Sequence, residues 1–187
     1  MYVNKGTPQI SCFGVYALDV NKQEVITLLA RNTILATGGA GNVYASTTNP
    51  PVATGDGIAM GDRAMARVAN MEFVQFHPTA FYDPETKPAF LITEAMRGAG
   101  AKLLHSFSKE RFMHKYDERL ELAPRDSVAR AIDTELKQSG TNYVLLDARH
   151  LSEHAIQEEF PNIDLYLKDK GIDMREEPIP VRPAAHY

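Results

Sequence analysis

The sequence predicts an α+β fold, and three stretches carry that prediction. Residues 11–19 alternate in polarity, a turn follows at 21–23, and 25–30 is apolar, which is typical of a β-hairpin. Residues 33–37 form a short apolar run that leads directly into glycines, as a buried strand does before a ligand-binding loop. Residues 124–138 repeat apolar side chains at helical spacing, so helices and strands are both expected.

The stretch 124–138 gives the strongest helix signal. Pro124 suits the first turn of a helix, where its missing N–H costs nothing. Val128, Ile132 and Leu136 fall on one stripe, and Gly140 is placed to end the helix. We therefore expect one apolar face against a core.

Shorter elements are expected on both sides of this helix. A strand is predicted at 143–146 and a hydrophobic stretch interrupted by polar residues at 73–81. The tail contains Pro178, Pro180 and Pro183, and no strand is predicted there. Further helices are predicted at 57–68, 91–97, 152–160 and 163–170, the third closed by Pro161.

Composition excludes several classes of protein. The 187 residues carry a net charge of -4 and no basic run, so a nucleic-acid surface is not expected. No apolar run reaches the roughly 18 residues of a membrane span. The single cysteine, Cys12, cannot form an internal disulfide and lies in an alternating strand pattern. With no signal peptide visible, we expect a cytoplasmic protein.

Glycine-rich segments form the first candidate site. Thr37, Gly38, Gly39 and Ala40 follow the predicted strand, and Asp56 lies between two further glycines. Such segments present backbone N–H groups to phosphate oxygens, and Asp56 could accept a hydrogen bond from a ribose or a ring nitrogen. The alternative is two tight turns.

His77 is the second candidate. It stands among aromatic residues and beside Pro78, which fixes the backbone. An imidazole in such a place can bind a carboxylate or transfer a proton. The alternative is a hydrogen-bonded histidine of the core.

Two charged motifs follow. Thr93, Glu94 and Arg97 fit one helical turn, so that the carboxylate and the guanidinium would meet; the alternative is a surface ion pair. Arg125 begins the predicted long helix and offers a planar fork to a carboxylate; the alternative is a structural pair with an aspartate. His186, in the last motif Pro183–Tyr187, is likewise either a functional residue or a structural one.

Other chemistries find no support in the sequence. No spacing of His, Cys, Asp and Glu is typical of a metal site, so none is predicted. No Ser–His–Asp arrangement stands out. The remaining histidines, His105, His114, His150 and His154, lie among charged residues and are expected at the surface.

The order of the motifs is more specific than any one of them. The chain resembles the flavoprotein family of succinate dehydrogenase, fumarate reductase and L-aspartate oxidase over residues 34–187. The segments MEFVQFHPTAF, PRDSVARAID and PIPVRPAAHY resemble the aspartate oxidase branch in particular. The ordered motifs are ATGGAG, TTNPP, TGDGIAMG, MEFVQFHPT, LITEAMRG, LAPRDSVARAI and PIPVRPAAHY.

This resemblance implies a division of the chain and a cofactor, FAD. Residues 1–70 would be part of an α/β FAD-binding domain that carries the β-hairpin, and 71–187 an α+β capping domain that closes over substrate. The GxGxxG fingerprint that holds the FAD pyrophosphate in this family is not within the 187 residues. We therefore expect a piece of a larger flavoenzyme that is inactive in isolation.

The resemblance also implies residue roles. His77, Thr93 and His186 would hold substrate carboxylates, and Arg125 would transfer the proton, with Glu94 and Arg97 as its relay. Flavin contacts would come from residues 37–41 and from Asp56. One departure is Gly98-Ala99-Gly100, where the family has Gly-Glu-Gly, which puts in doubt any role of that glutamate.

The activity implied is oxidation of L-aspartate to iminoaspartate, on the route to quinolinate and NAD. Hydride would pass to flavin N5, and oxygen or fumarate would reoxidise the flavin. One alternative is a flavoprotein subunit of succinate dehydrogenase or fumarate reductase; another is a non-catalytic capping module. A small dicarboxylate (L-aspartate, fumarate or succinate) is the expected ligand, and quinolinate synthase is a candidate partner.

Overall fold

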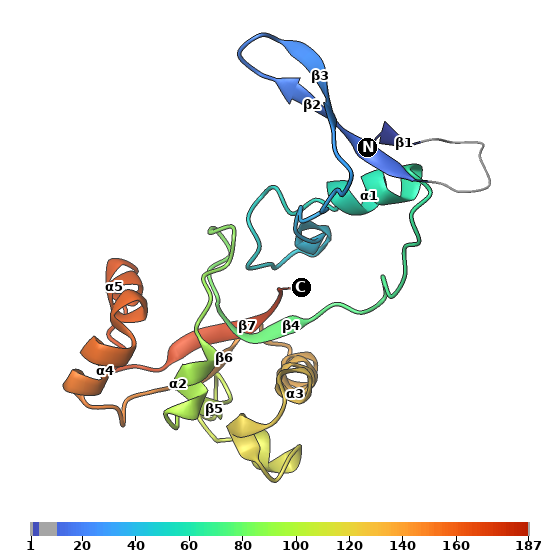
Figure 1. The fold of residues 1–187 in the computed structure, drawn as a ribbon. Coiled ribbons are helices and arrows are strands. Elements are labelled where there is room, and N and C mark those ends of the chain that lie inside the picture. Colours follow the sequence, from blue (N-terminus) through green and yellow to red (C-terminus); the bar gives the residue numbers. More distant parts are fainter. Residues whose placement is uncertain (1, 4–10, 187) are drawn as a thin grey trace. The chain divides into compact units, whose positions relative to one another are not determined.

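The computed structural model describes residues 2–3 and 11–186 (Figure 1). Contacts within the chain form two compact units. Unit 1 comprises Met1–Val43 and Pro51–Phe73, and unit 2 comprises Tyr44–Pro50 and Val74–Tyr187. Helices and strands occur together in both units, so the predicted α+β class is confirmed at this level.

Unit 1 contains the predicted hairpin. Strands β2 (Cys12–Asp19) and β3 (Glu24–Leu29) are antiparallel, and β1 (Tyr2–Val3) pairs with the other edge of β2. Gly14 is required here, because its φ is +141° and a Cβ would lie 1.9 Å from the carbonyl oxygen of Leu28. The hairpin prediction is confirmed, and Cys12 is a strand residue.

Two other predictions for unit 1 need correction. Residues 33–37 form no strand, because no other strand in the described residues pairs with them and an isolated segment cannot form a ladder. The helix predicted at 57–68 is α1 (Asp56–Arg63), which is shorter at its C-terminal end. Met65 has a φ of +63°, a left-handed conformation that stops helical propagation. A short 3₁₀ turn, η1 (Gly41–Val43), precedes α1.

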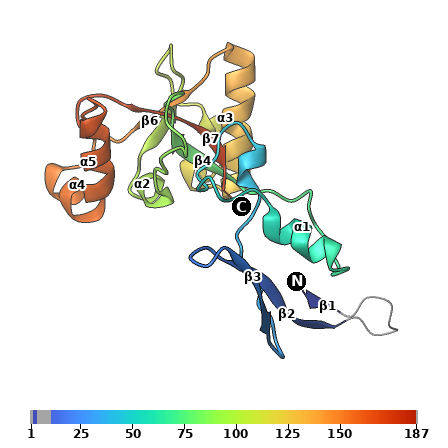
Figure 2. The same ribbon diagram turned by 90° about the horizontal axis from the view of Figure 1, so that it is seen from above.

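Unit 2 is built on an antiparallel four-stranded sheet with the order β4-β7-β6-β5. Helix α3 packs against β4 and β7 (Figure 2). The bounds of β6 differ by one residue from those of the predicted stretch 143–146. The strands are β4 (Phe76–Phe81), β5 (Lys102–Leu104), β6 (Val144–Asp147) and β7 (Ile179–Ala185).

Strand β7 was not predicted, because prolines normally stay out of interior strands. Pro183 is tolerated since the β4–β7 register shifts beside it: Ala184 pairs with His77, and Arg182 pairs with Ala80. The proline therefore lies opposite a bulge in β4, where no ladder N–H is needed. Pro180 still accepts a hydrogen bond through its carbonyl from the N–H of Tyr82 at 2.9 Å.

The long predicted helix is confirmed as α3 (Arg125–Ser139). Pro124 precedes its first residue, and Gly140 ends it in a left-handed conformation with a φ of +69°. The predicted stripe faces inward: Val128 and Ile132 are fully buried. Pro161 is the first residue of the last helix rather than a break after the previous one. The other helical elements are α2 (Glu94–Gly98), η2 (Met113–Lys115), η3 (Leu120–Leu122), α4 (Glu153–Glu159) and α5 (Pro161–Asp169).

One apolar core holds unit 2 together. It joins the inner face of α3 to the sheet and to α4 and α5, through residues such as Leu103, Leu146, Ile156 and Ile179. Burying each such side chain stabilises the fold by about 1.5–3 kcal/mol. The candidate residues of unit 2 described below lie on elements that pack on this core. Among the described helices, none combines the length and the apolar character needed to cross a membrane.

Candidate functional site

The candidate site in unit 2 begins where helices α2 and α3 start. Arg125 is the first residue of α3, and its Nε donates to Oε2 of Glu94, the first residue of α2, at 2.5 Å. Its Nη1 donates to Oε1 of Gln75 at 3.1 Å. The structure therefore joins two predicted residues that lie 31 positions apart. The alternative interpretation, a structural pair between Arg125 and an aspartate, is wrong, because the neighbouring Asp126 pairs with Arg130 instead.

Arg97 lies behind this pair. Its Nη2 is 3.5 Å from Oε1 of Glu94, as the i,i+3 spacing predicts, but the side chain is only 1% exposed. Nη1 donates to the carbonyl oxygen of Glu121 at 2.6 Å, whereas Nε and Nη2 have no hydrogen-bond partner. This burial excludes the surface-pair interpretation. Desolvation lowers the pKa of Arg97, and the nearby Glu94 opposes that shift.

Glu94 is a carboxylate shared by two guanidinium groups. The hydrogen bond from Arg125 is the main cause that lowers the pKa of Glu94, with the charges of Arg97 and Arg125 adding to it. Glu94 is therefore ionised at neutral pH. Thr93 caps α2, because its hydroxyl oxygen accepts the N–H of Ala95 at 3.4 Å, which leaves its own O–H free to donate elsewhere.

His77 projects from β4 and is 1% exposed. The backbone N–H of Thr79 donates to its Nδ1 at 3.2 Å. Because an amide N–H can only donate, Nδ1 is unprotonated and the neutral ring carries its proton on Nε2. Burial lowers the pKa of His77 to about 4, and the charges of Arg125 and Arg97 act in the same direction. His77 is therefore a neutral N–H donor at pH 7.

His186 follows the end of β7 and lies edge-on to His77, with 5.7 Å between the ring centroids. Its backbone N–H donates to the carbonyl of Gln75 at 2.9 Å, and its own carbonyl accepts from Nδ2 of Asn49 at 2.9 Å. Nδ1 of the ring is 2.7 Å from Oγ1 of Thr48. Burial lowers the pKa of His186, and the charge of Arg125 adds to the shift. Two histidines 109 positions apart in sequence thus share one site.

Three further residues were missed by sequence reasoning. Gln75 contacts Arg125 through its side chain and His186 through its carbonyl, and its polarity inside an apolar stretch was the available signal. Thr48 lies in the motif TTNPP, but nothing local predicts its contact with His186, which is 138 positions away. Glu121 accepts a hydrogen bond from Arg97 through its backbone carbonyl. Its buried carboxylate accepts from the N–H of Leu103 at 3.0 Å and from Arg111, which holds the residue in place.

The glycine-rich residues lie in unit 1. Gly38 has a φ of +75°, and a Cβ on Gly38 or Gly39 would meet no atom within 4 Å, so this backbone faces open space. The N–H of Gly55 donates to the carbonyl of Gly39 at 3.1 Å, and a Cβ on Gly57 would lie 1.7 Å from Oγ1 of Thr37. Open backbone in this conformation fits a group with phosphate oxygens, so the residues present are compatible with FAD. Asp56 begins α1, and Ala40 lies 3.2 Å from a Cβ built on Gly55.

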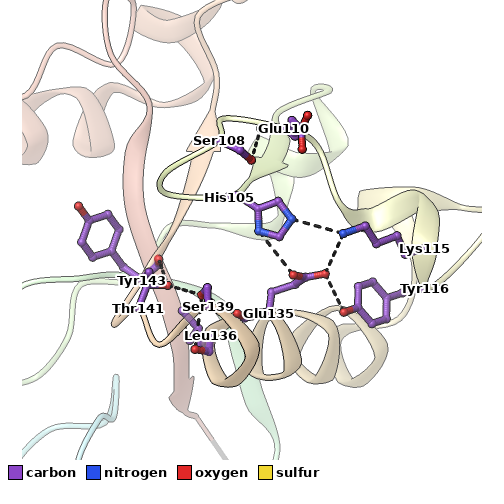
Figure 3. A network of polar contacts seen from close by, with 10 residues as sticks. All are labelled: His105, Ser108, Glu110, Lys115, Tyr116, Glu135, Leu136, Ser139, Thr141 and Tyr143. Atoms are coloured by element: carbon purple, nitrogen blue, oxygen red, sulfur yellow. Dashed lines mark hydrogen bonds and ion pairs between the residues drawn. The ribbon is translucent and has the colours of Figure 1, made fainter.

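A second polar cluster lies along the middle of α3, where three donors converge on buried Glu135 (Figure 3). The hydroxyl of Tyr116 donates to Oε1 of Glu135 at 2.8 Å. Lys115 Nζ and His105 Nδ1 each lie 3.5 Å from the carboxylate. The prediction of a surface position for His105 is therefore wrong, because pairing with Glu135 draws the ring inward. His114, His150 and His154 are exposed, as predicted.

A cleft of about 500 Å³ lies beside α3 and shares only Gln75 with the site. Its wall includes Tyr44, Phe76, Ala129 and Leu136. Hydrogen bonds and ion pairs assemble the candidate site, so we place the chemistry there rather than in this cleft. In the described parts of the chain, no three His, Cys, Asp or Glu side chains are grouped as metal ligands.

Comparison with known proteins defines the class. The model of the FAD-binding domain family matches residues 2–187, and the chain belongs to this flavoprotein family, so the prediction of FAD is confirmed. L-aspartate oxidase 1 of Ralstonia nicotianae is 57% identical over 182 residues, which cover 97% of this chain and 34% of that protein. The chloroplastic L-aspartate oxidase of Oryza sativa subsp. japonica is 54% identical over 187 residues, covering 96% of this chain and 29% of the rice protein.

Among solved structures, a quinol-fumarate reductase with menaquinol molecules is similar, with a TM-score of 0.76 and 35% identity. The match covers 88% of this chain and 31% of the reductase chain. The chain spans about a third of the length of the curated relatives described above. The resemblance seen in the ordered motifs is therefore confirmed at the level of the family.

Proposed function

We propose that this chain supplies the substrate site of an FAD-dependent L-aspartate oxidase, which converts L-aspartate to iminoaspartate. The observation that carries the proposal is the charge balance in unit 2. One carboxylate, Glu94, faces the guanidinium groups of Arg97 and Arg125, beside the two neutral rings of His77 and His186. The surplus positive charge favours an anionic substrate. Curated relatives at 52–57% identity are named L-aspartate oxidase, which supports the choice of amino acid.

Substrate carboxylates would be held by donors that have few other partners. His77 presents Nε2–H because Nδ1 is occupied, and Thr93 retains a free O–H. His186 lies 5.7 Å away, a spacing that allows two rings to contact one small dianion. Arg125 adds charge and a planar fork. Held at several points, the substrate loses its rotational freedom before reaction, and this positioning supplies much of the rate.

FAD, held by Thr37, Gly38, Gly39, Ala40 and Asp56, would supply the acceptor, flavin N5, for the hydride leaving substrate Cα. Side chains of this protein would transfer the proton that the substrate loses along with the hydride. A guanidinium can pass on a proton only transiently, and it needs a base beside it to receive that proton. Glu94 bonds directly to Arg125 at 2.5 Å and is ionised, so it can take that proton, with Arg97 behind it. The same residues can act in reverse, which suits fumarate reduction.

The wider role follows from this assignment. Residues 71–187 would form a cap that excludes water from the substrate, and 1–70 would contribute to flavin binding. Oxygen or fumarate would reoxidise the cofactor. We place the protein in the cytoplasm, in the route to quinolinate and NAD, with quinolinate synthase as a candidate partner.

One alternative is a flavoprotein subunit that interconverts succinate and fumarate. The 35% identity to a fumarate reductase favours it, and a site for a small dicarboxylate serves both reactions. A second alternative, a non-catalytic cap, predicts that the chain retains no flavin.

Flavin absorbance separates these functions. The flavin-loaded full-length protein that contains these 187 residues is mixed anaerobically with L-aspartate, succinate or L-glutamate, and bleaching of the visible bands is followed. L-aspartate alone should bleach them. Bleaching by succinate but not L-aspartate would favour the alternative subunit, and a protein that holds flavin but is bleached by neither would refute an oxidase.

A further inference from the structure

Both candidate substrate histidines are anchored at the same ring atom. The N–H of Thr79 donates to Nδ1 of His77 at 3.2 Å, and the hydroxyl of Thr48 lies 2.7 Å from Nδ1 of His186. The first contact fixes the tautomer, because an amide N–H has no other role. The second involves a hydroxyl, which can donate or accept, so the direction must come from its surroundings.

The backbone around Thr48 leaves the hydroxyl one good acceptor. The carbonyl of Ala185 already receives the N–H of Thr48 at 3.0 Å and the hydroxyl of Thr47 at 2.9 Å, which fills its two lone pairs. That carbonyl lies 3.5 Å from the Thr48 hydroxyl, against 2.7 Å for Nδ1 of His186. The proton of the Thr48 hydroxyl therefore points along the shorter contact, toward Nδ1 of His186.

The segment that carries Thr48 is itself firmly attached. Asn49 donates from its side-chain amide to the carbonyl of His186 at 2.9 Å, and Thr47 forms a parallel bridge with Ala185. Three consecutive residues thus hold the end of β7. This attachment fixes the direction of the hydroxyl of Thr48 as well as its distance from the ring.

We propose that Thr48 is a positioning residue that donates to Nδ1 of His186 and so holds the proton on Nε2, matching His77. Both rings then offer an N–H to the substrate carboxylates. In the other tautomer His186 would turn a lone pair toward an anion, and the contact would become repulsive. The inference rests on the proposed function, since it deepens the account of how the dicarboxylate is held.

Substitution at Thr48 tests the inference in the flavin-loaded protein. Thr48→Val keeps the shape but removes the donor, and Thr48→Ser restores it. Losing one charge-assisted hydrogen bond should raise KM for L-aspartate about tenfold, while the rate of flavin reduction at saturation changes by less than about threefold. Thr48→Ser should return KM to near the unsubstituted value. Thr134→Val is the matched control, because it removes a hydroxyl that bonds only the backbone of α3.

Nitrogen NMR of histidine-labelled protein gives a readout that does not depend on activity, with His186→Gln to assign the signal. Unsubstituted protein should show His186 protonated on Nε2 alone, and Thr48→Val should show a mixture of tautomers. Protonation on Nδ1 in the unsubstituted protein, or an unchanged KM and tautomer in Thr48→Val, would overturn the proposal. If L-aspartate fails to reduce the unsubstituted flavoprotein, the proposed function fails, while the NMR result still decides the role of Thr48. If Thr48→Val does not fold, the ring tautomer of His186 in the unsubstituted protein and in Thr48→Ala decides it.

Discussion

Two carboxylates in unit 2 are each surrounded by donors from helices and loops, yet the surroundings differ. Glu135 is 3% exposed and receives Tyr116, Lys115 and His105, which all converge on it (Figure 3). Glu94 has a side chain that is 43% exposed, and it is outnumbered by two guanidinium groups. In the Glu135 cluster the three side chains all contact the one carboxylate. In the Glu94 cluster some N–H donors remain unbonded and could bind a ligand.

The contrast shows how function can be separated from structure. A network whose donors all end on one acceptor stabilises the fold and needs no ligand. A network that buries a guanidinium with unbonded nitrogens, as at Arg97, bears a cost that a bound anion can offset. The following experiments break or sharpen this distinction.

The largest effect is expected at Arg125. Arg125→Lys keeps the positive charge but loses the planar fork that bonds Glu94 and Gln75 at once. Turnover of L-aspartate by the flavin-loaded protein should fall at least a hundredfold, with KM raised less than about threefold, as measured by steady-state kinetics. Arg130→Lys, at an exposed position further along α3, is the control. Equal losses in turnover and affinity at Arg125 would leave it a binding role only.

The burial of His77 beside two guanidinium groups also predicts a pH dependence. His77 has a pKa of about 4 in the folded state against about 6.5 in an unfolded chain. Between these values the unfolded state binds a proton that the folded state does not, so stability falls as pH drops from 6.5 toward 4. The full loss is about 3 kcal/mol.

Urea unfolding at pH 7.5 and pH 5 measures this loss. The decrease should be smaller in His77→Gln, in which the histidine that titrates is removed and the other carboxylates and histidines remain as an internal control. The same decrease in both proteins would show that His77 titrates normally.

At Glu135 we expect a loss of stability without a loss of function. Glu135→Leu removes the acceptor of Tyr116 and should lower the free energy of unfolding by about 1–3 kcal/mol, with an unchanged KM. Desolvation, with the hydrogen bond to Glu135, raises the pKa of Tyr116 to about 12. The pKa of Tyr116 should therefore decrease in Glu135→Leu. Ultraviolet titration measures it, with the titration of a Tyr116→Phe variant subtracted so that only the signal of Tyr116 remains. A changed KM would show that the Glu135 cluster also affects substrate binding, which contradicts its assignment as purely structural.

The smallest effect is expected at Gln75. Gln75→Leu removes one neutral acceptor from Arg125, while the carbonyl that holds His186 remains. Turnover should fall about threefold to tenfold, because such a bond contributes about 1 kcal/mol to holding Arg125 in place. Gln157→Leu, on the exposed face of α4, serves as the control. Turnover identical to that of unsubstituted protein would mean that Glu94 alone orients Arg125.

Local signals predicted the elements that depend on local physics. Helix α3 was found from its stripe and its ends, and the hairpin from its alternation, since neither needs knowledge of a distant partner. Strand β7 was missed because Pro183 is tolerated only at a register shift against β4, which no local pattern reveals. Residues 33–37 were wrongly expected to be a strand for the converse reason: apolar character suits a strand, but only a neighbouring strand makes one.

The candidate site divides in the same way. His77, Thr93, Glu94, Arg97, Arg125 and His186 were found as motifs, and the structure brings the charged ones and the two histidines together. Thr48 and Glu121 could not be found, because their parts depend on contacts with residues far along the chain. Sequence identified the candidate groups, whereas the fold identified the residues that contact them.

The most direct test of the account is whether the Glu94 cluster binds a dicarboxylate. L-aspartate, succinate and acetate are titrated into the 187-residue chain while the ring signals of His77 and His186 are followed by NMR, with His105 beside Glu135 as the internal reference. The account predicts saturable shifts of both site histidines with the dicarboxylates, none with acetate, and none at His105. Equal responses to acetate, or shifts at His105 alone, would contradict it.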